Sequence, residues 1–82
     1  MNWPAWWDWE LEISPHAEKR MEERDFTEID LREMVQRAHA FELDEIEGRY
    51  VIQTRGQQSD WKIIVEPDET DHLLVVVTAF PI

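Results

Sequence analysis

The stretch WELEISPHAEKRMEER, residues 9–24, decides the fold because its periodicity changes halfway along. Residues 9–13 alternate apolar and acidic side chains, and this period of two predicts a half-exposed strand. Ser14 and Pro15 follow, a favoured helix N-cap and a residue that suits the first helical turn. We therefore predict a strand over residues 9–13 and a helix from Pro15 to about Arg24.

A second helix is predicted to begin at Thr27 and to end near Ala38–His39. Thr27 and Asp30 have the spacing of a capping box, with Asp in the place of the usual Glu. Four apolar side chains lie within roughly a third of a turn of this helix, so they predict its core-facing side: Leu31, Met34, Val35 and Ala38.

The remainder of the chain reads as four short strands. We expect them over residues 41–46, 49–54, 61–66 and 72–80, with a polar loop at residues 55–60. Loops this short favour antiparallel pairing. The last strand is apolar on both faces, which is typical of the interior of a sheet. The sequence thus predicts an α+β domain: an N-terminal strand and two helices, followed by a four-stranded antiparallel sheet covered on one face.

Size and composition narrow the class of protein. The chain has 82 residues, enough for one domain, and five tryptophans but no cysteine, which excludes disulfides and thiolate chemistry. Its start lacks the features of a signal peptide, and the apolar run at residues 73–77 is too short to span a bilayer. We expect a cytoplasmic protein with no membrane partner. No glycine-rich phosphate loop or metal-ligand spacing is present, so no metal or other cofactor is expected.

The formal net charge of −11 bears on the choice of partner. A surface this acidic repels phosphate backbones at long range, which disfavours RNA unless a local cationic patch overrides the average. A protein partner, a basic one in particular, or self-association is easier to reconcile with this charge.

A row of cations on the first predicted helix is the main lead to a site. His16, Arg20 and Arg24 are spaced four residues apart, so each lies about 40° around the helix from the one before. The row borders the side expected to be buried through Ala17 and Met21. There the histidine can act as a general acid or base and the arginines can offset charge on a phosphoryl oxygen. The same spacing also suits weak Glu–Arg pairs that merely support a helix.

The chain resembles a bacterial family, domain of unknown function 4258, over residues 9–81. The resemblance is carried by His16-Ala17 with Arg20 and Arg24, by GRY at residues 48–50 and by VVTAF around Thr78. It implies a RelE-like fold of the barnase–colicin–RelE type, many members of which are metal-independent ribonucleases of toxin–antitoxin systems. On that resemblance the catalytic candidates are His16, Arg20, Arg49 and Thr78. Arg24 and Lys62 are assigned to anion binding.

The stretch WPAWWDW suggests a separate role for the N-terminus. We predict a tryptophan-rich arm over residues 1–8, ahead of a single domain over residues 9–82. Trp7 and Trp9 lie an even number of residues from the apolar residues of the first predicted strand, which places them on the same face, so both are expected to be buried. Trp3 and Trp6 have no such pattern and are predicted to bind a partner, the alternative being a local lid over the core.

Two functions follow from these observations. The first is a toxin-like ribonuclease, which predicts a local positive cleft. The second is a non-catalytic, acidic protein-interaction module that uses the tryptophan-rich arm. It predicts that Arg20 and Arg24 are engaged by internal salt bridges.

Overall fold

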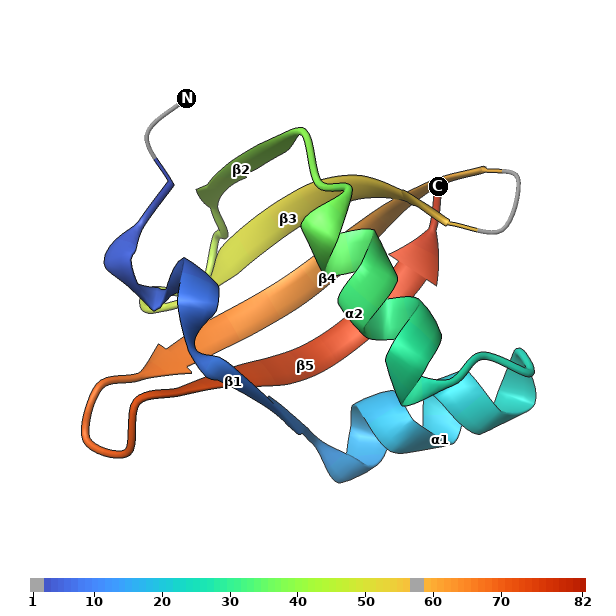
Figure 1. The fold of residues 1–82 in the computed structure, drawn as a ribbon, viewed down its shortest axis with the longest axis horizontal. Helices are drawn as coiled ribbons and strands as arrows, with labels where there is room; N and C mark the ends of the chain where they lie inside the picture. The colour runs from blue at the N-terminus through green and yellow to red at the C-terminus, as the bar shows by residue number, and fades with distance from the viewer. Residues whose placement is uncertain (1–2, 57–58) are drawn as a thin grey trace.

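The computed structural model describes residues 3–56 and 59–82 and combines two α-helices with one five-stranded sheet (Figure 1). A 3₁₀ turn, η1 (Ala5–Asp8), precedes the first strand. The remaining elements, in chain order, are β1 (Glu10–Ile13), α1 (Pro15–Glu23), α2 (Glu28–Gln36), β2 (Ala40–Leu43), β3 (Tyr50–Gly56), β4 (Ser59–Asp68) and β5 (Leu73–Pro81).

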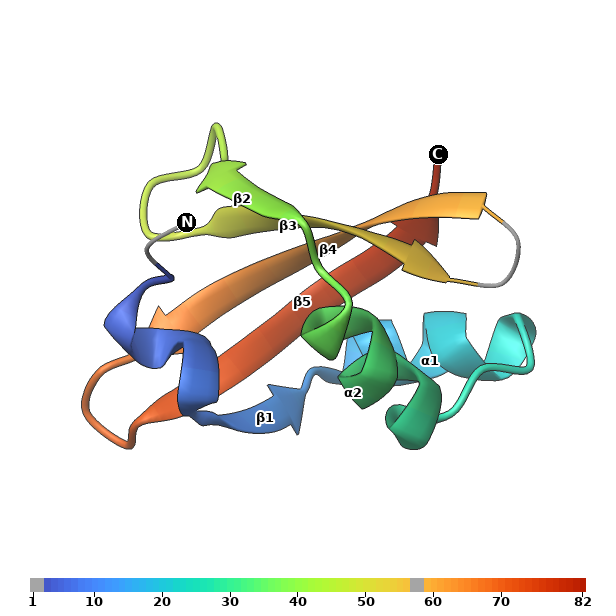
Figure 2. The same cartoon turned by 45° about the horizontal axis from the view of Figure 1, so that its top comes forward.

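The strand order of the sheet is β1-β5-β4-β3-β2 (Figure 2). The last four strands form the predicted antiparallel meander, and β5 lies inside the sheet as expected. The sheet nevertheless has five strands and not four, because β1 joins it by pairing in parallel with the first half of β5. The two helices provide the long connection that a crossover from one edge of the sheet to the other requires.

Ser14 joins the end of β1 to the start of α1. Its hydroxyl accepts a hydrogen bond from the Ala17 amide at 3.1 Å, so it caps the helix as predicted. The same hydroxyl donates to the Val77 carbonyl at 2.9 Å, and the Ser14 amide donates to the Val76 carbonyl. The hydrogen bonding along β5 thus continues one residue beyond β1, and α1 then packs against the second half of β5.

The helix α2 begins with the predicted capping box, in which Thr27 and Asp30 bond each other's main-chain amides. Its predicted apolar stripe faces the core: Leu31, Met34 and Val35 are buried and Ala38 packs against them. The helix ends at Gln36, with Arg37 as its C-cap, two residues earlier than expected. His39 instead donates its amide to the Gln53 carbonyl, which starts the pairing of β2 with β3.

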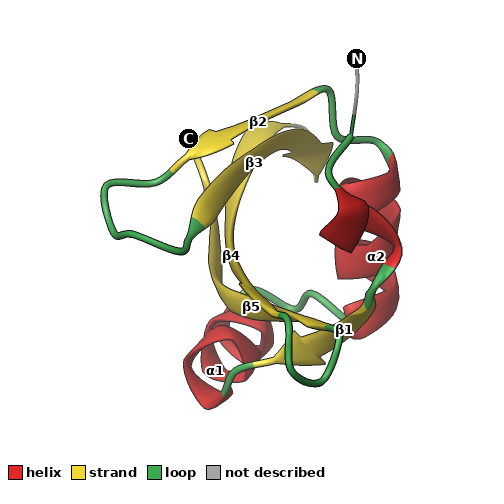
Figure 3. Ribbon diagram, turned by 90° about the vertical axis from the view of Figure 1, so that its left-hand side faces the viewer, coloured by secondary structure: helices red, strands yellow, loops and turns green. Residues whose placement is uncertain are grey.

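The core lies between α2 and the concave face of the curved sheet (Figure 3). Alternate residues of β4 supply that face, since Trp61, Ile63 and Val65 are buried. Ala17 and Met21 of α1 reach the same core from the edge beside β5, as their helical positions predicted. The opposite face of the sheet, here called the outer face, carries the intervening residues of each strand.

Several strand boundaries differ from those predicted. The strand expected to end at Ile46 ends at Leu43, because the Asp44 carboxylate accepts from the Ile46 amide and Gly48, with a φ of 86°, turns the chain. At the other end of β3, most of the polar loop expected at residues 55–60 is strand. The central part of that loop, residues 57–58, lies outside the described residues.

The tryptophans are arranged differently from the prediction. Trp6 is only 7% exposed and belongs to the core, so it offers no surface to a partner. Trp7 and Trp9 are half-buried and pack against the core, where full burial was expected. The reason is that η1 interrupts the strand periodicity and turns Trp6 inward, toward Tyr50 and Phe41. Trp3 is 37% exposed and stacks on Trp7.

Candidate functional site

Three of the predicted site residues share the outer face of the sheet. Lys62 lies between the buried Trp61 and Ile63, and Thr78 pairs with Ile64, its outward-facing neighbour. Arg49 precedes β3 and its guanidinium reaches Glu66, which is also on the outer face. The register therefore places Arg49, Lys62 and Thr78 on one side of the molecule, although on different strands.

His16 and Arg20 lie on α1, beside the part of the outer face that β5 forms. The opposite flank of the helix, with Glu18 and Glu22, lines a pocket against the start of α2. Since the helix places His16 and Arg20 on the other flank, they point away from α2. Figure 3 shows α1 next to β5, outside the curve of the sheet. The predicted catalytic residues thus border a common side, but no hydrogen bond or ion pair between described residues joins α1 to Arg49, Lys62 or Thr78.

The arginines of the predicted site are engaged within the chain. Arg20 pairs with Glu23 at 3.6 Å, and Arg49 Nε pairs with Glu66 Oε1 at 3.3 Å. Arg24 Cζ lies 6.0 Å from the centroid of the Trp61 ring, within the range of a cation–π contact. The two ion pairs are exposed or half-exposed, so each adds little to stability, but each places a carboxylate beside the cation that an incoming phosphate would need.

His16 is exposed, and its imidazole forms no hydrogen bond with any residue in the described part of the chain. An efficient general base is held in place by a partner on its second ring nitrogen. Thr78 is half-buried, and its partner in the sheet is the apolar Ile64. The described side chains therefore do not hold a base, an anion-binding arginine and a hydroxyl in one fixed cluster.

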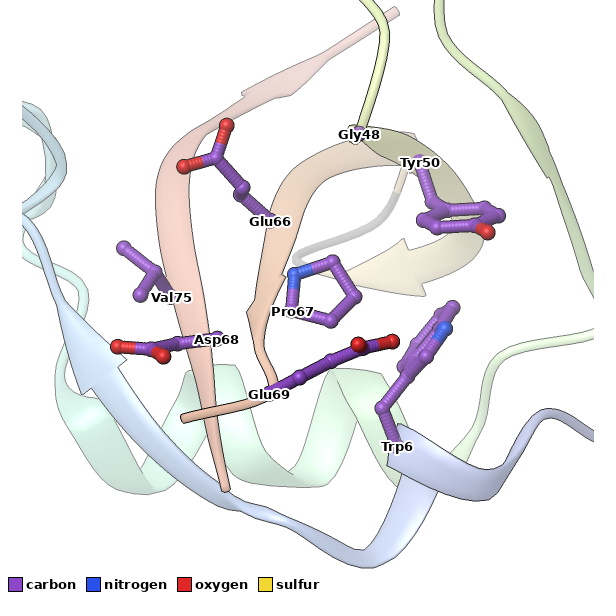
Figure 4. Close-up of a pocket in the computed structure, with 8 residues that line it drawn as sticks. All are labelled: Trp6, Gly48, Tyr50, Glu66, Pro67, Asp68, Glu69 and Val75. Carbon is purple, nitrogen blue, oxygen red and sulfur yellow. The ribbon is translucent and has the colours of Figure 1, made fainter. Parts of the chain in front are cut away.

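One pocket among the described residues was not expected from the sequence. It has a volume of about 540 Å³ and lies near the β4–β5 turn and η1. Figure 4 shows the rings of Trp6 and Tyr50 along one wall, Pro67 facing them, and Glu69 extending toward Trp6. Glu66, which is paired with Arg49, and Asp68 also line the pocket, but their carboxylates point away from these rings (Figure 4), and no lysine or arginine is among the lining residues. The signal in the sequence was the acidic run EPDE at residues 66–69, which reads as an ordinary turn.

Within residues 3–56 and 59–82, no group of three or more histidine and carboxylate side chains is arranged to hold a metal ion. Neither described helix is long and apolar enough to cross a membrane.

The comparison with known families agrees with the resemblance seen in the sequence. The model of the family "Domain of unknown function (DUF4258)" matches residues 13–81. The chain therefore belongs to this family, which by its description has no assigned function. Searches of curated proteins and of solved structures gave no match.

Proposed function

We propose that this protein is a non-catalytic, acidic interaction module whose partner is a basic protein. The observation that carries the proposal is that Arg20, Arg24 and Arg49 are all engaged within the chain. With these cations engaged and a net charge of −11, the surface available to a partner is predominantly acidic. Charge complementarity then favours basic partners and raises their rate of encounter.

The chemistry of the pocket near the β4–β5 turn and η1 supports this proposal. The half-buried Tyr50 ring and the Glu69 carboxylate, which extends toward the same wall (Figure 4), suit a guanidinium or an ammonium group, which is attracted both by ring faces and by negative charge. In this proposal the tryptophan-rich arm contributes through Trp3 and not through Trp6. Trp6 belongs to the core, and Trp3 is the member of the pair that retains an exposed ring.

The test is a selection of random 12-residue peptides displayed on phage, at low and at physiological salt. We expect enrichment of peptides that combine lysine or arginine with apolar residues, and affinities that fall as salt rises. A matched selection on a charge-neutral protein of similar size removes peptides that bind any surface. Enrichment of acidic or uncharged peptides, or of none, would contradict the proposal.

A toxin-like ribonuclease of RelE-like fold is the second candidate. One observation favours it: His16 and Arg20 lie on the flank of α1 that borders the outer face, which carries Lys62 and Thr78. In such an enzyme a base removes the proton of a ribose 2′-hydroxyl, and the oxygen attacks the adjacent phosphorus. The bond from phosphorus to the 5′-oxygen of the next nucleotide breaks, that oxygen leaves and takes up a proton from water, and a 2′,3′-cyclic phosphate forms. His16 would serve as that base, and Arg20 would offset the charge of the pentacoordinate state.

This second candidate is tested by incubating the protein with mixed cellular RNA and with translating ribosomes. His16→Ala and Arg20→Ala are the variants, and Arg32→Ala on α2 is the matched control. Cleavage by wild type and by Arg32→Ala that both site variants lose would establish the enzyme and displace the interaction module as the first proposal. No cleavage in either assay would remove the ribonuclease.

A further inference from the structure

The strand β2 forms an edge of the sheet that no described element covers. It pairs with β3 on one side only, and it is the last strand in the order β1-β5-β4-β3-β2. On its free side, an edge strand leaves main-chain amides and carbonyls of alternate residues without sheet partners. The opposite edge differs, because α1 follows β1 and packs along β5.

Apolar side chains are exposed along this same edge. Leu43, at the end of β2, is 74% exposed, and Ile46, in the turn that follows, is 54% exposed. Trp3 packs on Phe41 of β2, with a ring-centroid distance of 5.5 Å, and keeps part of its ring exposed. We call this surface the β2 edge and define it by residues 42–47 together with Trp3.

Charge distinguishes the β2 edge from an ordinary apolar patch. Residues 42–47 contain four carboxylates, and no lysine or arginine occurs between residues 38 and 48. The next cation along the chain, Arg49, is paired with Glu66. Two copies of this edge would bring like charges together, so the carboxylates act against self-pairing and favour a cationic strand.

We propose that the β2 edge binds an extended, basic segment of another protein, which adds to the sheet as a sixth strand. Main-chain hydrogen bonds to β2 supply part of the affinity. Lysine or arginine side chains of the segment meet the carboxylates of residues 42–47, and its apolar side chains cover Leu43 and Ile46. The proposal rests on the proposed interaction module and names both its surface and the form of its ligand.

The probe is a capped nine-residue peptide in which lysine and valine alternate. We expect it to bind the wild-type protein and to shift the amide resonances of residues 40–47 more than those of α1. Two further versions of this peptide are N-methylated at every second residue, one at the odd-numbered and one at the even-numbered positions. Both keep the charge and the apolar side chains. One of them loses the amide hydrogens that face β2, so the affinity of that version is expected to fall about tenfold.

Two double variants separate docking at this edge from general attraction. Glu45→Lys/Glu47→Lys and the control Glu18→Lys/Glu22→Lys each change the net charge by four units, from −11 to −7. All four positions are exposed, and circular dichroism checks that both variants are folded. We expect the first to weaken binding about tenfold and the control less than about threefold.

Equal losses in the two double variants, or equal binding by both N-methylated peptides, would overturn the β2 edge as the site. The proposal would also be overturned if the free protein forms a dimer and the Glu45→Lys/Glu47→Lys variant changes that association, since the occupant of the β2 edge would then be a second copy. If basic peptides are selected but bind this variant as tightly as wild type, the β2 edge fails and the interaction module stands. If no basic peptide is selected, the module fails.

Discussion

The hydroxyl of Thr54 on β3 donates a hydrogen bond to the main-chain carbonyl of Met34 in the last turn of α2. A carbonyl in that position has no guaranteed partner within its helix, and here the Ala38 amide donates to Val35 instead. Thr54 is also the buried polar side chain of the described core. One bond therefore satisfies a helix end and joins α2 to the sheet.

Thr54→Val is expected to lower the free energy of unfolding by about 1–3 kcal/mol, because it leaves the Met34 carbonyl buried without a partner. Thr54→Ser keeps the hydroxyl and is expected to cost less than Thr54→Val. Urea denaturation, followed by tryptophan fluorescence, measures both. A valine variant as stable as wild type would show that the carbonyl finds another donor.

Gly56 lies where the end of β3 passes close to Met34 and Trp61. A Cβ atom at this position would overlap the Met34 sulfur and would stand 2.9 Å from Trp61 Cδ1. Trp61 has little freedom to move, since it is buried and stacks on Phe26 with centroids 5.1 Å apart. Gly56→Ala is therefore expected to destabilise the protein by about 1–3 kcal/mol.

The origin of that cost can be checked with a double variant. Met34→Ala removes the side chain that the new methyl group meets, so Gly56→Ala/Met34→Ala should be more stable than the sum of the two single effects predicts. Thermal unfolding of all four proteins measures this coupling. Strict additivity would place the strain of Gly56→Ala elsewhere.

Trp6 and Trp3 belong to one predicted arm but are expected to contribute unequally to stability. Trp6→Ala removes a core side chain and should cost about 3–5 kcal/mol. Trp3→Ala removes a stack on Trp7, with centroids 4.2 Å apart, and should cost about 1 kcal/mol. Urea midpoints of the two variants test this. Equal losses would mean that Trp3 is as much a part of the core as Trp6.

Ser14 is predicted to matter through both of its hydrogen bonds. Ser14→Ala loses the cap of α1 and the bond to the Val77 carbonyl, with an expected cost of about 1–2 kcal/mol. Ser14→Asp can still cap the helix but sets a carboxylate against that carbonyl. We expect it to rescue helicity, measured by circular dichroism, but not the melting temperature. Full recovery of both would assign the role of Ser14 to capping alone.

Much of the local structure could be predicted from the sequence, because it depends on neighbours in the chain. Residues 9–13 alternate and residues 10–13 form a strand, Ser14 and Thr27 cap helices, and the apolar stripe of α2 is buried. Prediction was less accurate where contacts between residues far apart in the sequence determine the structure. Trp6 is turned inward by packing on Phe41 and Tyr50, and the longer β3 and β4 stabilise each other as far as Gly56 and Ser59.

The candidate site shows the same division. The sequence by itself determined the charge of −11, the spacing of His16, Arg20 and Arg24 on one helix, and the acidic run over residues 42–47. Only the tertiary structure decided that Arg49 pairs with Glu66, that Arg24 lies over Trp61, and that β2 forms a free edge. The physical reason is that spacing within a helix fixes only local geometry. The partner of a charge or of a strand edge depends on residues that folding brings from far along the chain.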